Sequence, residues 1–575
     1  MSSLLNKEQF FLIFIVVLFS SFSVTAQMKT PENQSLGQPL LASPTLLQKY
    51  KISFKSPDLQ PIYAYAKAQY SNQYLAYDQA EIALTYLSLA QEAQNVSLIS
   101  LRNQYISDAM ATLKFMTTYL VNSRIRDKNG IIEFWDTSLQ DETLTRVSKL
   151  ARDQALTLLA IDKLLTFIDN GYSVDNSTYL FYEESISNIW SFLQSLYDPT
   201  FGGWYTKTTP INESTFSIDT TKRTADNMII ISSLADISHI SLLEQNFTEI
   251  KLENILSKSM NFFMNKFLVP NEGIASFGTA NGFFASKSTF FAKENALYGL
   301  ANLDLYKLTG NKTYETNAES IWSYIKNSFW EIGFGGVFIG ITAQGDPVIA
   351  GKAIEDQIFF ALLSLELASL DLNNANFLSY YLKMVILINH NFIQGNNVAS
   401  STDLRFNPSS EYYVRSVAYY IKFIITIPHV SLITVPNSII IGNTLPTKIY
   451  VSNLGNLLLN ISIDSTNSFS PVSLVTNETF VERELVFESN VQAGYQKLQF
   501  NISISKTLIQ QLYINTNLTP NVRIPNGLVY LIGAGILAGL VIFVRRPPEF
   551  IKNYVHDLKI ERQPITESEE RNEHR

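Results

Sequence analysis

A pattern of one acidic residue followed directly by an amide occurs five times along the chain, and it is the strongest candidate for chemistry in the sequence. Each copy opens an apolar stretch with the periodicity of a helix. The five copies are Asp78-Gln79, Asp153-Gln154, Asp226-Asn227, Glu294-Asn295 and Asp356-Gln357. Two carboxyl groups at a suitable separation can act as the acid and the base or nucleophile of glycoside cleavage, so a face that gathers these side chains would support that reaction.

Charged neighbours distinguish three of the acids as candidate catalytic residues, namely Asp153, Asp226 and Asp356. Arg152 next to the first and Arg223 near the second should keep both carboxylates ionised, which suits a base or nucleophile. Glu355 next to the third would let that pair share one proton, which suits an acid.

An architectural role for the same residues stays open. An acid in the first turn of a helix is stabilised by the helix dipole, and an amide after it can bond between neighbouring helices. No mechanism needs five equivalent acids, so at least part of the role of the pattern is structural.

Loops rich in glycine and aromatic residues lead into these helical stretches, and they supply the expected sugar contacts. The segment 197–205 contains Gly202-Gly203-Trp204-Tyr205. Flat rings beside acids and amides are the usual means of holding a sugar. The predicted substrate-binding residues are Trp204, Tyr205, Trp135, Asp78, Glu294 and Glu355.

The spacing of the repeats predicts the fold. Successive copies are about 60 to 75 residues apart, and a degenerate sixth copy follows at Arg415-Ser416. Between them lie amphipathic stretches at 97–120, 178–196, 252–267, 314–325 and 376–388, and 61–70 would supply a twelfth helix. We expect a mainly α (α/α)6 toroid over 49–427, with an open helical solenoid as the alternative.

Residues 428–520 change character, with alternating β-branched runs separated by Asn, Gly, Ser and Pro. The length and alternation predict an Ig-like β-sandwich. It would serve as a spacer, or else bind carbohydrate or protein.

The two ends of the chain predict a membrane-anchored extracellular protein. Residues 1–26 have the pattern of a signal peptide, with an uncleaved anchor as the alternative, and 27–48 form a linker. An uncharged run at 527–544 followed by Arg545-Arg546 predicts a single transmembrane helix with a disordered cytoplasmic tail at 545–575. Ten Asn-X-Ser/Thr sites all precede that run, as expected of a glycoprotein on the cell membrane.

Composition excludes several classes of function. The chain has no cysteine, which rules out thiolate chemistry, and only five histidines, which disfavours a site built from clustered histidines. We expect neither a metal nor a cofactor. A net charge of −8 makes nucleic acid an unsuitable partner. The oligomeric state stays open.

Three stretches carry a resemblance to a known family. They are DPTFGGWYTKTTP with DTTKRTADNMIIISSLADI, KENALYGLANLDLYKLTGNKTYETNAESIWSYI, and GFGGVFIGITAQGDPVIAGKAIEDQIFFALLSL. They resemble the repeat units of N-acylglucosamine 2-epimerase-like proteins within the six-hairpin glycosidase-like superfamily. The helical part is also similar to spermatogenesis-associated thioredoxin-like proteins, without the thioredoxin domain.

The resemblance covers about residues 60–426 and implies a sugar-binding toroid in which inner-helix acids act as general acid or base. The epimerases move a proton with paired histidines, whereas Lys293-Glu294-Asn295 stands where one would be expected. Epimerisation is therefore disfavoured. The leading hypothesis is a glycoside hydrolase-like or lyase-like protein that acts on a carbohydrate or glycoconjugate, and the alternative is a non-catalytic receptor or structural glycoprotein.

Overall fold

The computed structural model describes most of the chain between residues 32 and 519. The gaps are 37–39, 41–44, 56–60, 121–129, 139–146, 213–214, 238–248, 271, 284–287, 350, 372–374, 437, 441–444, 454–458, 466–468, 477–479, 488–493 and 505–506. The predicted signal peptide, transmembrane helix and tail lie outside the described residues. Within those residues, no helix combines the length and the apolar character that a membrane crossing requires.

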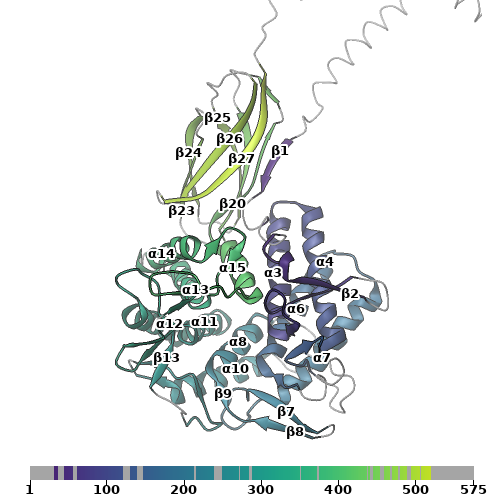
Figure 1. Cartoon of the computed structure of the whole chain (residues 1–575), viewed down its shortest axis with the longest axis vertical. Coiled ribbons are helices and arrows are strands. Elements are labelled where there is room, and N and C mark those ends of the chain that lie inside the picture. Colours follow the sequence, from purple (N-terminus) through teal and green to yellow (C-terminus); the bar gives the residue numbers. More distant parts are fainter. Residues whose placement is uncertain are drawn as a thin grey trace, which may run out of the picture.

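An inner ring of helices forms the centre of the larger domain (Figure 1). Its members in the described chain are α3 (Ala76–Asn95), α6 (Ala151–Asp169), α8 (Thr224–Asp236), α11 (Ala292–Thr309), α13 (Ile354–Leu370) and α15 (Val414–Thr426). Each packs against the next, and α15 packs against α3. The ring is therefore closed, as the repeats predict, and the solenoid alternative is wrong.

Outer helices connect successive inner ones. They are α4 (Ile99–Phe115), α7 (Asn176–Ser195), α10 (Glu249–Lys266), α12 (Lys312–Tyr324) and α14 (Ala375–Asn391). Inner helices lie between this layer and the axis and are buried nearly all round. At the α11–α13 contact the packing is so close that a Cβ on Gly299 would lie 2.8 Å from the methyl groups of Leu363. The absence of a side chain there sets the helix spacing.

The predicted twelfth helix at 61–70 is wrong. Pro61–Tyr65 forms strand β3, which pairs with β2 (Lys51–Lys55). Residue by residue, Pro61–Tyr65 is paired antiparallel with Lys51–Lys55, an extended pairing that belongs to a strand rather than a helix. The described residues therefore place five outer helices around six inner ones.

Short strands lead directly into five inner helices: β4 (Gln73–Leu75), β6 (Lys149–Leu150), β9 (Lys222–Arg223), β13 (Thr289–Phe291) and β16 (Gly351–Ala353). Three of them pair with further short strands, β5 (Phe134–Asp136), β14 (Gly340–Thr342) and β19 (Ser401–Asp403). Pairs such as β4–β5 and β16–β19 tie neighbouring loops together. The loops at the N-terminal ends of the inner helices are thereby held in fixed positions.

A separate β-domain follows the toroid. One sheet has the order β1 (Glu32–Leu36), β20 (His429–Pro436), β22 (Leu445–Ser452), β25 (Phe480–Phe487). The other has the order β21 (Ser438–Ile440), β27 (Thr507–Thr519), β26 (Gly494–Ile504), β23 (Leu459–Ser465), β24 (Phe469–Thr476). Strand β1 lies in the segment 27–48 that was predicted as a linker, so the first described residues of the chain belong to this domain. The Ig-like type of the domain stays a prediction.

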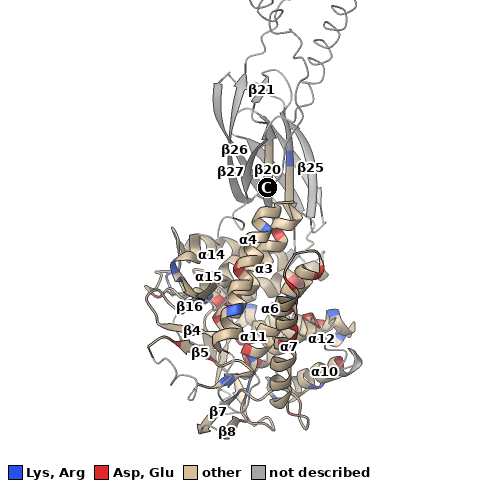
Figure 2. Cartoon of the chain, turned by 90° about the vertical axis from the view of Figure 1, so that its right-hand side faces the viewer, with Lys and Arg blue, Asp and Glu red and all other residues tan. Residues whose placement is uncertain are grey.

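The two domains meet at the C-terminal end of α3. Buried Glu92 accepts hydrogen bonds from the hydroxyls of Ser431 and Ser452 and lies 3.2 Å from Nε2 of His429. Burial alone would raise the pKa of Glu92, but these three partners together lower it. The β-domain therefore sits over the end of the inner ring opposite to the helix starts (Figure 1). On the face seen in Figure 2, basic and acidic residues are interspersed over the toroid.

Candidate functional site

The amides of the acid-amide pattern hold the incoming loops. Oε1 of Gln79 accepts from the N–H of Tyr65 at 2.9 Å, while Nε2 donates to the carbonyl of the same residue at 2.7 Å. The same pair of hydrogen bonds joins Gln154 to Ile131, Asn227 to Trp204 and Gln357 to Val337. Asn295 accepts from Ile274 and donates within its own helix. The amide half of the pattern is therefore architectural.

The acids of the pattern lie together at one end of the ring. Each is the third residue of its inner helix, and all five therefore belong to first turns. Four of them are almost fully buried, namely Asp78, Asp153, Asp226 and Asp356. Several keep a carboxyl oxygen that has no hydrogen-bond partner among the described residues: Asp78 Oδ2, Asp153 Oδ2, Asp226 Oδ2 and Glu294 Oε2.

The second residue of an inner helix, one place before the position of the acids, reaches across to the following helix. In α15 this residue is Arg415 and Ser416 stands at the acid position, so the predicted register of the sixth copy is wrong by one residue. Nη1 of Arg152 on α6 lies 3.0 Å from Oδ1 of Asp226 on α8. Nε of Arg415 on α15 lies 2.7 Å from Oδ1 of Asp78 on α3. Sequence reasoning missed these partners because they depend on which helices are neighbours. The one sign of these partners in the sequence is that three of the six inner helices carry a cation at this position.

At the third such junction, α11 to α13, Lys293 contacts both members of an acidic pair. Its side chain is ion-paired with Glu355, and its backbone N–H donates to Oδ1 of Asp356 at 2.8 Å. Burial would raise the pKa of Glu355, but Lys293, Arg415 and Arg152 together lower it. Burial raises the pKa of Asp356 to about 8 in spite of Lys293. The surroundings therefore move the pKa values of these two adjacent carboxyl groups in opposite directions.

Two expectations about charged neighbours need correction. The cation paired with Asp226 is Arg152 from the preceding inner helix, whereas Arg223 is exposed. Arg152 also contacts Asp153 at 3.2 Å, but burial outweighs it and raises the pKa of Asp153 to about 7. Burial likewise raises the pKa of Glu294 to about 7. Asp153 is therefore not the firmly ionised base that its sequence neighbour predicts.

Trp204 has only 1% of its surface exposed and packs against Tyr197 with ring centroids 5.2 Å apart. The buried ring offers no face to a ligand, which corrects the prediction of Trp204 as a sugar-binding wall. Gly202 and Gly203, both with positive φ, turn the hairpin so that this ring enters the core. Tyr205 and Trp135 are half-buried on the same loop layer, and Trp135 meets Tyr119 edge-on.

A layer of cations over aromatic rings lies directly inside the ring of acids. The guanidinium groups of Arg152 and Arg415 both lie over the ring of Tyr77, at 4.7 and 4.6 Å from its centroid. The hydroxyl of Tyr77 is hydrogen-bonded to that of Tyr419, and Lys293 lies 5.6 Å from the ring of Phe359. These three rings line the inner end of an axial cavity, so the layer separates the acids from it.

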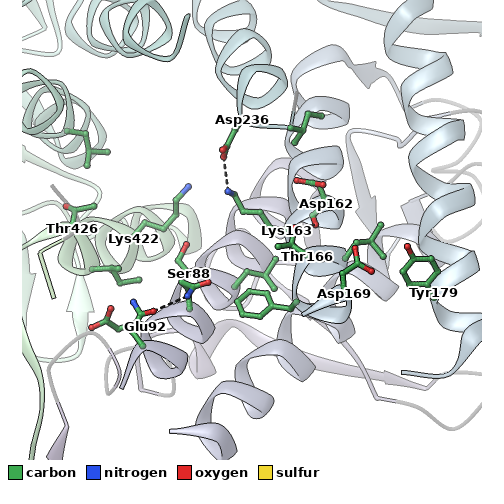
Figure 3. A pocket seen from close by; sticks show the side chains of 18 of the residues that line it. Ser88, Glu92, Asp162, Lys163, Thr166, Asp169, Tyr179, Asp236, Lys422 and Thr426 are labelled. Carbon is green, nitrogen blue, oxygen red and sulfur yellow. Dashed lines mark hydrogen bonds and ion pairs between the residues drawn. The ribbon is translucent and has the colours of Figure 1, made fainter. Parts of the chain in front are cut away.

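The axial cavity has a volume of about 660 Å³, and its wall combines leucine and isoleucine side chains of the inner helices with charged ones such as Glu81, Asp304, Lys307 and Glu366. A neighbouring cavity of about 700 Å³ lies between α3, α6, α7 and α15 (Figure 3). The two share Asp236, Leu362 and Lys422. The axial cavity extends from the first turn of α3, at Tyr77, to the last turns of α11 and α13, whereas the neighbouring cavity lies toward the C-terminal ends of the inner helices. None of the predicted catalytic acids lines either one. Among the described residues, no group of three or more His, Asp or Glu side chains is arranged to hold a metal ion.

Comparisons with known proteins identify the fold. No family model and no curated protein matches the chain. The structure of a D-mannose isomerase aligns with a TM-score of 0.52 and 12% identity, over 66% of this chain and 95% of that one. A cellobiose 2-epimerase from Bacillus thermoamylovorans aligns with a TM-score of 0.51 and 10% identity, over 67% and 96%. A GH76 alpha-mannanase from Bacteroides thetaiotaomicron aligns with a TM-score of 0.46 and 13% identity, over 67% and 93%.

At such low identity the likeness to the isomerase and the epimerase speaks for the fold alone. The predicted resemblance is confirmed at that level, and about two thirds of the chain forms an (α/α)6 toroid.

Proposed function

We propose that the chain is a membrane-anchored extracellular protein that acts on carbohydrate, with glycoside hydrolase-like chemistry at the N-terminal ends of the inner helices. The observation that carries the proposal is the pair Glu355 and Asp356, whose pKa values are driven apart by their surroundings. Carboxyl groups separated in this way are suited to the roles of base and acid. The sugar isomerase and epimerase named above share the fold, which adds support to a sugar as the substrate.

In this proposal Asp356 gives its proton to the leaving oxygen of the glycosidic bond. Glu355, ionised and partly exposed, either takes a proton from the attacking water or attacks the anomeric carbon itself. Lys293 holds both carboxyl groups in place. Asp153, with a pKa of about 7, supplies a second group able to exchange a proton at neutral pH.

Epimerisation by paired histidines lacks support. Among the described residues, His390 lies near the end of α14 and bonds to the carbonyl of Ile386, and His429 lies at the start of the β-domain. Neither is in a first turn of the inner ring.

A non-catalytic binding scaffold is the second candidate. It is favoured by the layer of Tyr77, Arg152 and Arg415, which fills the space at the axis next to the acids. A toroid that only binds would keep its acids as partners of these cations.

The anchoring and the extracellular location rest on the sequence at 1–26 and 527–544 and on the glycosylation sites. Asn176 and Asn311, both in Asn-X-Ser/Thr sites, lie exposed at the starts of outer helices, where an attached glycan would meet no core residue. The β-domain, of Ig-like type in this proposal, would hold the toroid away from the membrane.

The test is to incubate the purified full-length chain with a panel of glycans and to measure the release of reducing ends. Turnover that is lost in Asp356→Asn supports the hydrolase. If the wild type binds a glycan but does not cleave it, the chain is a non-catalytic binding scaffold and not a hydrolase.

A further inference from the structure

The side chains that solvent reaches at the acid ring are mainly basic. Arg152, Lys293 and Arg415 keep 23–24% of their side-chain surface exposed, and Glu355 keeps 20%. The acids Asp78, Asp153 and Asp226 behind them keep only 1–4%. Glu294, the remaining acid of the pattern, is also partly exposed, so a ligand that enters this end of the toroid meets three cations and two carboxyl groups first.

Arg415 has free donors in a fixed orientation. Its Nε is hydrogen-bonded to Asp78, and its guanidinium plane lies over Tyr77. Nη1 and Nη2 have no hydrogen-bond partner among the described residues, so the two terminal nitrogens form an unused fork. Such a fork matches the two oxygens of a carboxylate, and a side chain held at Nε and at its face loses little freedom on binding.

A second guanidinium lies over the same tyrosine ring. Arg152 uses Nε and Nη1 for Asp153 and Asp226, and it lies over the same tyrosine ring as Arg415. Two cations held near one ring repel each other, and an anion between them would relieve that repulsion. Each guanidinium already has one ion-paired carboxylate, Asp226 for Arg152 and Asp78 for Arg415, so a further anion would bind through the terminal nitrogens of Arg415 that these pairs leave unused.

Building on the proposed function, we propose that the sugar bound at this end of the toroid is acidic, a uronic acid residue whose carboxylate occupies the terminal nitrogens of Arg415 with Arg152 beside it. The ring of the sugar then lies toward Glu355 and Lys293, on the side where the proposed acid and base stand.

The experiment compares two ligands that differ only at C6, methyl glucuronide and methyl glucoside, by calorimetric titration of the full-length chain at low ionic strength. We expect the glucuronide to bind about tenfold more tightly or better, and the preference to fall as salt rises. Arg415→Lys keeps the charge and a partner for Asp78 but removes the fork, so it should lose most of the preference. Lys422→Gln, which changes an ion pair about two turns further along the same helix, should keep it.

Arg152→Lys provides a second variant should Arg415→Lys fold poorly, and it should reduce the preference as well. Equal affinity for the two glycosides, or no binding of either, overturns the inference. So does an unchanged preference in a folded Arg415→Lys protein, and so does inorganic sulfate binding as tightly as the glucuronide. In each of these cases, release of reducing ends from a neutral glycan would show that the chain is a hydrolase as proposed, although its substrate is not acidic.

Discussion

Nε of Arg415, on the last inner helix, lies 2.7 Å from Oδ1 of Asp78, on the first, across 337 positions of sequence. One turn further along α3, the same junction carries a second ion pair, Lys422 with Glu81 at 2.9 Å. Thus two ion pairs join the last inner helix to the first.

The same arrangement occurs at two further junctions. Between α6 and α8, Arg152 pairs with Asp226 and Lys163 with Asp236. Between α11 and α13, Lys293 pairs with Glu355 and Lys307 with Glu366. In each case the cation belongs to the earlier helix. Every second junction between inner helices therefore carries two ion pairs of this kind, and the pattern repeats three times around the ring.

The buried pair at the closure should matter more for stability than an exposed one. Asp78→Asn leaves Arg415 without its carboxylate and should lower the free energy of unfolding by about 1–3 kcal/mol. Asp236→Asn removes a pair whose two side chains are 40% and 54% exposed, and it should cost less than about 1 kcal/mol. Urea denaturation of both variants gives the comparison, and equal losses would argue against the closure pair as a stabilising contact.

The amide clamps should be essential to the fold. Gln154→Met removes the partner of both the N–H and the carbonyl of buried Ile131, and each group left unsatisfied costs about 1–3 kcal/mol. Gln91→Met, at an exposed position whose amide bonds only to Asn95, should be close to neutral. Thermal denaturation followed by circular dichroism measures both. A Gln154→Met protein as stable as the wild type would show that the clamp is dispensable.

Stability should depend on pH through Asp356. Its folded-state pKa of about 8 lies above the ordinary value of 3.8, so the folded chain holds a proton that the unfolded chain has lost between these values. The contribution is fully present below about pH 4 and disappears as the pH rises through about 8. Asp356→Asn, which keeps an acceptor for the N–H of Lys293, should therefore match the wild type near pH 4 and melt at a higher temperature near pH 8.

Asp346→Asn, in an exposed turn, is the control for that pH series. Its melting temperature should follow the wild type across the range. If Asp356→Asn did the same, the carboxyl of Asp356 would not be the group that holds the proton.

Trp204 should behave as a core residue. Trp204→Ala should cost about 3–5 kcal/mol of unfolding free energy because it empties a buried site, while Trp204→Phe should fold and bind any glycan as the wild type does. Calorimetric titration of Trp204→Phe checks the second part. A large loss of glycan affinity in a stable Trp204→Phe protein would show that the ring of Trp204 belongs to the binding site.

The sequence allowed the inner helices and their order to be predicted, because an acid and an amide at a fixed place in each first turn make the repeat visible. The helix expected at 61–70 failed because Tyr65 is held extended by Gln79, a contact that local periodicity does not encode. Trp204 was misplaced for a similar reason, since the turn at Gly202 and Gly203 decides on which side the ring lies.

Candidate site chemistry was harder to predict than the fold. The acids were found from their own pattern, but the partner of Asp226 comes from the preceding helix and the protonation of Asp153 is set by burial. The role of Arg415 was hidden because only the closed ring brings it next to Asp78. Each of these features depends on how helices are arranged around the axis.

The most direct test of the proposed chemistry compares two glutamates of α13 that both pair with a lysine of α11. Glu355 lies at the acid ring and Glu366 at the opposite end of the helix. With a glycan that the wild type cleaves, the initial rate of Glu355→Gln should fall by about 100-fold or more, and that of Glu366→Gln should stay within about twofold of the wild type. Undiminished cleavage by Glu355→Gln, or an equal loss in both variants, would contradict the account.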